Sequence, residues 1–300
     1  MPIPKNKKLF LESSKEEVEA ILQASINGNP LMSRELKRIL QNVINLKFNE
    51  ENIDINDLKA FLIEESRLHK IGFQTPRTET LYFWDSIDKY KLLSTLRPNG
   101  YYSHLTAMHL HGLIDYEPEN IFFNNEQSAR LAGGNLEQSR IDNAFKKKQR
   151  ITTAQTNYEG KVYWLLSGKQ TGNYGVTHIK SPSGADVAVT DLERTLIDIA
   201  VRPAYAGGVN SVLQAYKIAQ PKISITRLSK TLSSLSYVYP YHQSVGFYVE
   251  NAGNFSDKAI KEFLAFAPIQ YEFYLDYEMQ NTVYSQKWKL HYPSNLFTLT

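Results

Sequence analysis

Residues 54–84 read DINDLKAFLIEESRLHKIGFQTPRTETLYFW, and this stretch decides the fold expected of the N-terminal part of the chain. Its first part predicts a helix that begins at Asp54 or Asn56. The apolar residues that this helix is expected to bury are Leu58, Phe61, Leu62 and Leu68. KIGFQ and ETLYFW follow on either side of the turn-like TPRT, and their alternating pattern predicts a hairpin of two short strands.

Two more helices are predicted upstream of this stretch. SSKEEVEAILQASINGN (13–29) offers Ser14 as an N-cap, and MSRELKRILQNVINL (32–46) repeats the plan with Ser33. Three helices followed by a hairpin are the order of a winged helix-turn-helix. We therefore predict a DNA-binding domain of this kind at residues 1–84.

The remainder of the chain, residues 85–300, is predicted to form a larger mixed α/β domain, which places the whole chain in the α+β class. Apolar strands are expected at IFFN, KVYWLLS, ADVAV and EFYLD. Helices are expected between them at NLEQSRIDNAFKKK, TDLERTLIDIAV, NSVLQAYKIAQ, ITRLSKTLSSL and SDKAIKEFLAF. Residues 256–300 contain no motif with a recognisable function.

The composition is that of a compact globular chain. Of its 300 residues 42% are hydrophobic, and 19 Tyr, 14 Phe and 3 Trp can fill a core. The absence of Cys excludes disulfides and Cys-based metal sites, and it fits a reducing compartment. The start of the chain turns acidic where a signal peptide would need an apolar stretch, and no run approaches about 18 apolar residues. We expect a soluble cytoplasmic protein with no membrane partner.

The stretch SHLTAMHLHGLID contains three of the seven histidines of the chain. They stand at His104, His109 and His111, whereas a helical metal pair needs two ligands four residues apart on one face. We expect an ordinary helix, capped by Ser103 and ended by Gly112, with its histidines at the rim of a core. No metal and no other cofactor is expected for the chain.

A second distinctive stretch is VTDLERTLIDIAVRPAYAGGVNSVLQAY. Thr190 and Glu193 have the spacing of a capping box at the start of a helix. Arg194 has the helical spacing to pair with Asp191 or Asp198. The glycine pair in AYAGGV predicts a tight turn between two helices in preference to an anion site.

An enzyme is an alternative interpretation of the same stretch. An acidic cluster for metal-dependent nuclease or nucleotidyltransferase chemistry would consist of Asp186, Asp191, Glu193 and Asp198. Two-metal sites commonly use a close pair of carboxylates on one strand, and the chain has no D-x-D motif. It also lacks the P-loop, dinucleotide-binding, nucleophile-elbow and HExxH motifs. We assign no catalytic residue and predict that the chain is not an enzyme.

Two segments of the chain resemble the AbiEi family of predicted transcriptional regulators, the antitoxins of type IV toxin-antitoxin systems. The matching residues of YYSHLTAMHLHGLID are Ser103, Leu105, Thr106, Ala107, His111, Gly112 and Leu113. The matching residues of VTDLERTLIDIAVRPAYAGG are Thr190, Asp191, Glu193, Arg194, Thr195, Leu196, Asp198, Arg202, Pro203, Tyr205, Gly207 and Gly208. Together with the helical N-terminal region, the resemblance extends to about residue 255.

The resemblance implies a winged helix that binds operator DNA at its own promoter. It also implies a C-terminal domain that neutralises a nucleotidyltransferase-like toxin encoded nearby, and no catalysis by the antitoxin itself. Whether neutralisation needs a direct complex stays open. The alternative is a DNA-binding regulator of the same architecture whose C-terminal domain serves a different partner or ligand.

The charge of the predicted DNA-binding domain is balanced. From Met1 to Glu79 the chain has 12 Lys and Arg residues and 12 Asp and Glu residues, so DNA binding requires an asymmetric distribution of these charges. Side chains suited to a DNA surface occur on the second helix, near the start of the third and in the wing turn. These predicted DNA contacts are Arg34, Lys37, Arg38, Asn56, Lys59 and Arg77.

The densest basic run lies elsewhere, in RIDNAFKKKQR. Its basic residues are Arg140, Lys146, Lys147, Lys148 and Arg150. Three interpretations stay open for this second basic surface. It is a second DNA contact, a surface for the toxin or the nucleic-acid substrate of the toxin, or a solvated helix end whose cations complement the helix dipole.

Overall fold

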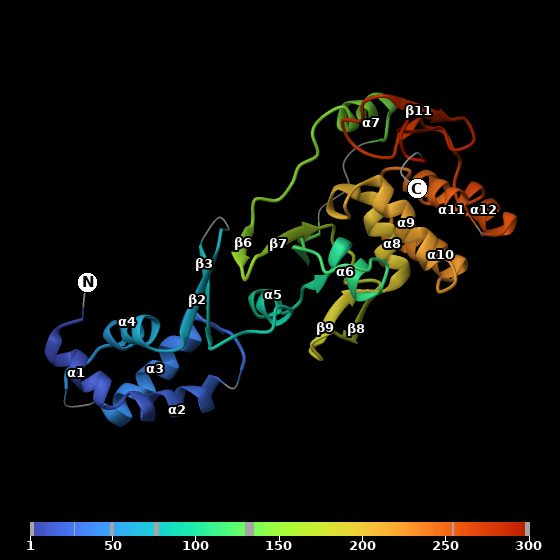
Figure 1. Cartoon of the computed structure of the whole chain (residues 1–300). Helices are drawn as coiled ribbons and strands as arrows, with labels where there is room; N and C mark the ends of the chain where they lie inside the picture. Colours follow the sequence, from blue (N-terminus) through green and yellow to red (C-terminus); the bar gives the residue numbers. More distant parts are fainter. Residues whose placement is uncertain are drawn as a thin grey trace. The chain divides into compact units, whose positions relative to one another are not determined.

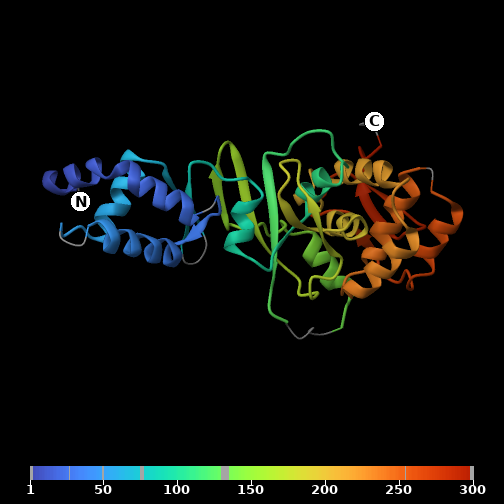
Figure 2. The same cartoon turned by 90° about the horizontal axis from the view of Figure 1, so that it is seen from below.

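The computed structural model describes residues 3–26, 28–48, 51–74, 78–129, 135–253 and 255–297. The chain forms two compact units, whose elements are labelled in Figure 1 and seen from another side in Figure 2. The first comprises Met1–Asn99, Thr153–Tyr158 and Ser183–Ala185, and the second comprises Gly100–Thr152, Glu159–Pro182 and Asp186–Thr300. A helical N-terminal region and a larger region with a mixed sheet confirm the predicted α+β class. In the part of the chain that is described, no helix is long and apolar enough to cross a membrane.

The first unit has the winged helix-turn-helix order that the sequence predicts. Its elements are α1 (Lys5–Ser13), α2 (Lys15–Ile26), β1 (Leu31–Met32), α3 (Ser33–Lys47), α4 (Ile55–Glu65), β2 (Leu68–Phe73), β3 (Glu79–Trp84) and α5 (Lys91–Leu96). The strands form an antiparallel sheet in the order β1-β3-β2, so β2 and β3 make the wing. The structure adds α1, β1 and α5 to the predicted elements. Helix α5 packs against β1 within this unit.

Helix α4 begins after Asp54, one of the two predicted starts. Oδ1 of Asp54 accepts hydrogen bonds from the backbone N–H groups of Asn56 and Asp57 at 2.7 and 2.9 Å. The helix ends at Glu65, so Leu68, which we expected on its buried face, lies on β2 instead. Leu68 is buried all the same, because its position on the strand faces the same apolar core. The predicted N-cap of α3, Ser33, is also wrong by one residue, because the observed N-cap is Met32.

The second unit combines a mixed sheet with a group of helices. Its elements are β4 (Tyr101–Tyr102), α6 (His104–Leu110), β5 (Asn120–Glu126), α7 (Gln138–Phe145), β7 (Lys161–Gly168), β8 (Val176–Lys180), β9 (Asp186–Thr190), α8 (Leu192–Val201), the 3-10 helix η1 (Pro203–Tyr205), α9 (Val209–Ala219), α10 (Ile225–Leu235), α11 (Tyr241–Asn251), α12 (Asp257–Leu264), β10 (Phe273–Tyr274), β11 (Thr282–Ser285) and β12 (Leu290–Pro293). The main sheet of this unit has the strand order β7-β5-β4-β9-β8, and β6 (Gln155–Tyr158) belongs to the residues of the first unit. A small sheet has the order β10-β12-β11.

Helix α8 is central to the second unit. Helices α9, α10 and α11 lie around it in Figure 1, and each packs against it. Every residue from Glu193 to Ala200 is buried. The N-cap is Asp191, whose Oδ1 accepts a hydrogen bond from the backbone N–H of Arg194 at 2.8 Å, so the predicted capping box is wrong. Thr190 cannot serve as the cap because its backbone pairs with β8 as the last residue of β9.

The predicted pairing of Arg194 with Asp198 is confirmed, and the pair is buried. Nε of Arg194 donates to Oδ1 of Asp198 at 2.8 Å, and the two side chains are only 5% and 7% exposed. Nη1 of Arg194 also donates to the carbonyl of Tyr174 at 2.7 Å. A guanidinium this deeply buried is stable only with a carboxylate partner and further acceptors, because removing two charges from water is costly.

The three clustered histidines of α6 do not converge. Nδ1 of His109 lies 3.0 Å from the carbonyl of Tyr116, and Nε2 of His111 lies 2.6 Å from the carbonyl of Thr190. His104 is buried, which corrects the expectation that it lies at the rim of the core. It is buried because α6 packs against both β5 and α8. Within the described ranges, no group of three His, Asp or Glu residues is arranged to hold a metal ion.

The C-terminal residues complete the core of the second unit. Trp288 is fully buried, and a Cβ added at Gly246 of α11 would lie 2.3 Å from its ring. The hydroxyl of Tyr274 on β10 donates to Asp142 of α7 at 3.0 Å. Figure 1 shows α7 beside these C-terminal strands, although the two are far apart in the sequence. Residues 256–300, in which we recognised no motif, therefore contribute to the core of the second unit.

Replacing Asp198 with Ala is expected to lower the free energy of unfolding by about 3–5 kcal/mol, because Arg194 is left buried without its carboxylate. The double variant Arg194→Met, Asp198→Leu removes both charges and is expected to recover most of that loss. Urea unfolding of the two variants and the wild type measures both effects. A single variant as stable as the double variant would contradict the account of this pair.

Burial lowers the pKa of His104 from 6.5 to about 4. The folded state therefore binds the proton more weakly than the unfolded state, so the stability that this residue contributes is complete above pH 6.5 and is lost as the pH falls toward 4. The variant His104→Asn should lose stability less steeply over that range, which urea unfolding at several pH values measures. Equal steepness for variant and wild type would show that His104 is not buried in its neutral form.

Candidate nucleic-acid interface

The structure describes five of the six predicted DNA contacts. Arg34, Lys37 and Arg38 lie on α3, and Asn56 and Lys59 lie on the first two turns of α4. Arg77 lies outside the described residues. Arg34, Lys37, Arg38 and Asn56 are exposed and Lys59 is half-buried, so each can reach a ligand. The two helices that a winged helix uses on DNA thus carry these side chains.

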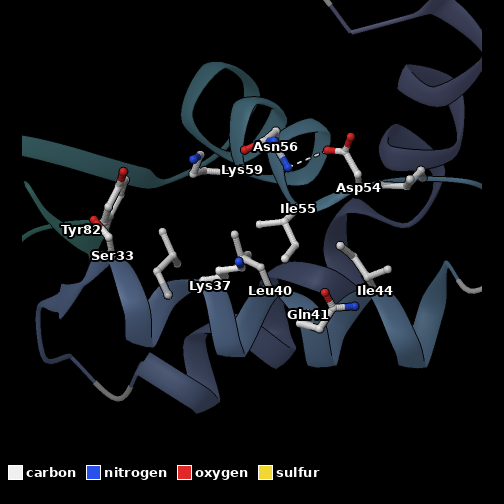
Figure 3. Close-up of a pocket in the computed structure, with 12 residues that line it drawn as sticks. Ser33, Lys37, Leu40, Gln41, Ile44, Asp54, Ile55, Asn56, Lys59 and Tyr82 are labelled. Atoms are coloured by element: carbon white, nitrogen blue, oxygen red, sulfur yellow. Dashed lines mark hydrogen bonds between the residues drawn. The ribbon is translucent and has the colours of Figure 1, made fainter.

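Lys37, Asn56 and Lys59 line one groove between α3 and α4, with a volume of about 580 Å³. Its other lining residues are Ser33, Leu36, Leu40, Gln41, Ile44, Ile53, Asp54, Ile55 and Tyr82. Figure 3 shows Asn56 and Lys59 on the α4 side and Lys37 and Gln41 on the α3 side. Buried apolar residues such as Leu40 form part of the lining. The groove therefore combines an apolar lining with amide and ammonium groups from both helices.

Ion pairs compensate many acidic side chains elsewhere in the first unit. The pairs are Lys7–Asp57 at 2.5 Å, Lys8–Glu65 at 2.6 Å, Arg67–Asp85 at 3.1 Å, Arg97–Glu79 at 2.6 Å and Lys47–Glu17. Arg34, Lys37, Arg38 and Lys59 take part in no ion pair between described residues. The near-equal numbers of acidic and basic residues therefore conceal an uneven distribution, in which α3 and the start of α4 carry uncompensated positive charge.

Asp57 lies on α4 between the proposed contacts Asn56 and Lys59, and its carboxylate pairs with Lys7. Two other carboxylates near this surface are used as helix caps. Oε2 of Glu35 accepts a hydrogen bond from the backbone N–H of Met32 at 2.9 Å, and Asp54 caps α4. Asp54 occupies the backbone N–H groups of Asn56 and Asp57 and places a carboxylate at the start of α4, which disfavours a phosphate at that helix end. Any contact that α4 makes with DNA must therefore come from side chains such as Asn56 and Lys59.

Three residues of the groove with hydroxyl or amide groups were not among the predicted DNA contacts: Ser33, Gln41 and Tyr82. Gln41 lies four residues after Lys37, so helical spacing from the predicted contact was a usable signal for it. Tyr82 reaches the groove because it pairs with Leu31, immediately before α3. That pairing is tertiary and has no local signature in the sequence.

The second basic surface is divided in the structure. Helix α7 ends at Phe145, and the three exposed lysines Lys146, Lys147 and Lys148 follow its C-terminus, where cations complement the helix dipole. Arg140 on α7 donates to the carbonyl of Asn135 at 2.9 Å. Arg150 lines a cavity of the second unit instead. The geometry favours the helix-end interpretation for the lysines and sets Arg150 apart from them.

The four carboxylates of the alternative, enzymatic interpretation are each bound by a cation, and two of them share Arg227. Asp186 pairs with Lys180 at 2.8 Å, and Asp191 caps α8. Glu193 pairs with Arg227 at 3.2 Å, and Asp198 pairs with the buried guanidinium of α8. Asp191 also lies 3.4 Å from the guanidinium of Arg227, so all four carboxylates already face a cation. Among the described residues, no group of three such side chains is arranged to hold a metal ion.

Comparisons with known proteins give a likeness of fold. No family model matches the chain, and no curated protein matches it. Among solved structures, the chain is similar to the RV2827C protein from Mycobacterium tuberculosis, with a TM-score of 0.59 and 14% sequence identity. The likeness covers 97% of this chain and 92% of that chain. At this identity it shows a shared fold through both units, without information on function.

Changing Arg34, Lys37 and Arg38 together to Gln is expected to weaken binding to duplex DNA. Because each phosphate contact adds about 0.9 to the slope of log affinity against log salt, the slope should fall by about 2 to 3. Fluorescence anisotropy with a labelled duplex at several salt concentrations measures both quantities.

The matched control for this variant changes three other lysines to Gln, namely Lys8, Lys15 and Lys47. Their ammonium groups lie within 4.0 Å of glutamates, and Lys47 is the last residue of α3, at the opposite end from Arg34. The control therefore removes the same charge from outside the proposed contacts. The control should keep the salt slope of the wild type. Equal slopes for the two triple variants would contradict the assignment of the interface to α3.

Proposed function

We propose that the chain is a DNA-binding transcriptional regulator and that its first unit contacts duplex DNA through α3 and α4. The observation that carries this proposal is the uncompensated positive charge of Arg34, Lys37, Arg38 and Lys59 on two neighbouring helices of a winged helix. A local basic surface of this kind, and not the net charge of a domain, is what a phosphate backbone requires.

The side chains divide naturally between two roles. Arg34, Lys37 and Arg38 are placed for phosphate contacts that position the protein, as expected of the helix that precedes the recognition helix. Asn56 and Lys59 lie near the start of α4, where a recognition helix reads bases, and an amide can bind adenine in a bidentate manner. Arg77 keeps its proposed role as a wing contact on the basis of the sequence.

We further propose that the regulator is an AbiEi-type antitoxin, which binds its own promoter and neutralises a nucleotidyltransferase-like toxin encoded beside it. The resemblance in the segments around His111 and Arg194 supports this part of the proposal. These segments form α6, α8 and their surroundings in the core of the second unit, so the likeness concerns the fold of that unit. The alternative keeps DNA binding and gives the second unit a small ligand, and a large cavity there favours it.

A reporter gene behind the upstream region of this gene tests the regulator. Repression is expected with the wild type and with the Lys8, Lys15, Lys47 control, and it should be lost with the Arg34, Lys37, Arg38 variant. A lower amount of the variant protein would also reduce repression. An immunoblot therefore checks that wild type and variants are present at equal levels. Full repression by the Arg34, Lys37, Arg38 variant would overturn the proposed DNA surface.

Growth of cells that express the neighbouring reading frame, alone and together with this chain, tests the antitoxin. Toxicity should be relieved by the wild type and equally by the Arg34, Lys37, Arg38 variant, because neutralisation is assigned to the second unit. A harmless neighbour, or toxicity that the chain does not relieve, would contradict the antitoxin proposal and leave the DNA-binding regulator with another ligand.

A further inference from the structure

The second unit contains a cavity of about 860 Å³ that the proposed DNA-binding function does not use. It is lined by residues that precede β6, by the end of β7, by α8 and η1, and by the segment that leads into α11. All of these residues belong to the second unit. The volume lies within the range of about 300–1,000 Å³ that is usual for binding sites of small molecules.

Positive charge dominates the lining of this cavity. The cations are Arg150, Lys169, Arg194 and Arg202, and the carboxylate that accompanies them is Asp198. Asp198 is bound to Arg194, and Lys169 donates to the carbonyl groups of Leu235 and Ser236 at 2.6 and 2.5 Å. These contacts leave Arg150 and Arg202 as the lining cations that can accept an anionic ligand.

Arg202 is held in position without a carboxylate. Its guanidinium lies 5.7 Å from the centre of the Tyr277 ring, a cation–π contact. Within the described residues, neither Arg202 nor Arg150 takes part in an ion pair. Arginine presents a planar fork of donors that matches the oxygens of a phosphate group. An anion that enters the cavity can therefore contact either guanidinium group without breaking a salt bridge.

Five tyrosines also line the cavity, namely Tyr205, Tyr237, Tyr239, Tyr241 and Tyr277. Tyr241 packs edge-on to Tyr237 at 5.2 Å and to Tyr239 at 6.2 Å, with interplanar angles of 74° and 75°. Tyr237, Tyr239 and Tyr277 are only partly buried, so a ligand can reach them. Lys169 lies over the Tyr237 ring and Arg202 over the Tyr277 ring, which leaves the opposite faces for a ligand. Aromatic faces of this kind stack on nucleobases, and inorganic phosphate makes no use of them.

Backbone strain occurs at the same cavity. His104 lines it with φ of +52°, a left-handed conformation that is unfavourable for a residue other than glycine. Its ring packs edge-on to Tyr205 at 5.4 Å, and Nδ1 lies 2.8 Å from Oγ of Ser103. Such strain concentrates at ligand sites because the surrounding structure holds a residue in a fixed position. His104 thus fixes one of the aromatic walls.

We propose that this cavity binds a nucleoside phosphate, with the phosphate on Arg150 and Arg202 and the base against the tyrosine rings. The combination of two unpaired guanidinium groups with several partly exposed rings supports this class of ligand. The inference is independent of the proposed DNA binding, since none of its residues belongs to the first unit.

Isothermal titration of the full chain tests this proposal with ATP, GTP, adenosine and inorganic triphosphate as probes. At least one of the two nucleotides should bind. Adenosine lacks the phosphate for the arginines and inorganic triphosphate lacks the base for the tyrosines, so each should bind more weakly than that nucleotide by about tenfold or more. Inorganic triphosphate that binds as tightly as both nucleotides would overturn the role of the tyrosines. No binding of either nucleotide would overturn the site.

Variants locate the nucleotide within the molecule. Arg202→Gln and Arg150→Gln should each weaken nucleotide binding about tenfold, while Arg140→Gln removes the same charge from outside the cavity and should have no effect. Arg150 is exposed, so its replacement tests the site even if Arg202→Gln fails to fold.

The Arg34, Lys37, Arg38 variant should bind the nucleotide as the wild type does, because the cavity contains no residue of the first unit. Loss of binding in that variant, or no effect of Arg150→Gln, would assign the nucleotide to another surface and overturn the proposal.

Discussion

The buried ion pair of Arg194 and Asp198 is the constraint on which the second unit depends. Each buried ion costs several kcal/mol in lost hydration, so every donor of the guanidinium needs an acceptor. Asp198, the carbonyl of Tyr174 and, at 3.5 Å, the hydroxyl of Tyr101 supply these acceptors from α8, from the segment before β8 and from β4. The same pair lines the cavity, so the interaction that locates α8 also shapes the proposed ligand site.

The ion pairs of the first unit lie nearer the surface than the buried pair of the second unit. The pairs of the first unit are mostly exposed and individually weak, of the order of 1 kcal/mol or less, and they contribute little to stability. Their consequence is electrostatic: they neutralise acidic side chains outside α3 and leave a basic surface on a domain with little net charge. This distribution supplies the local basic surface that the proposed binding of a phosphate backbone requires. The proposed DNA surface and the proposed nucleotide site share no residue.

Local signals in the sequence predicted many of the helices and strands, but they did not predict the cavity of the second unit. The capping side chain of Asp54 and the alternating pattern of the wing strands are local signals. The helix start after Asp54 and the hairpin of β2 and β3 that they predict are both confirmed. The N-cap of α8 was misplaced because strand pairing commits Thr190, and His104 was misplaced because two distant elements cover it. The cavity had no signature in the sequence, since its cations and tyrosines lie on segments from residue 150 to residue 277.

Hydrogen-deuterium exchange of the full chain, with and without a duplex from its own upstream region, tests the central claim most directly. Bound DNA covers backbone amides and orders side chains, so the account predicts slower exchange in α3 and α4 and no change in α7 or in the lysines that follow it. Protection confined to residues 138–150, or no protection in the first unit at all, would contradict the assignment of DNA binding to the winged helix.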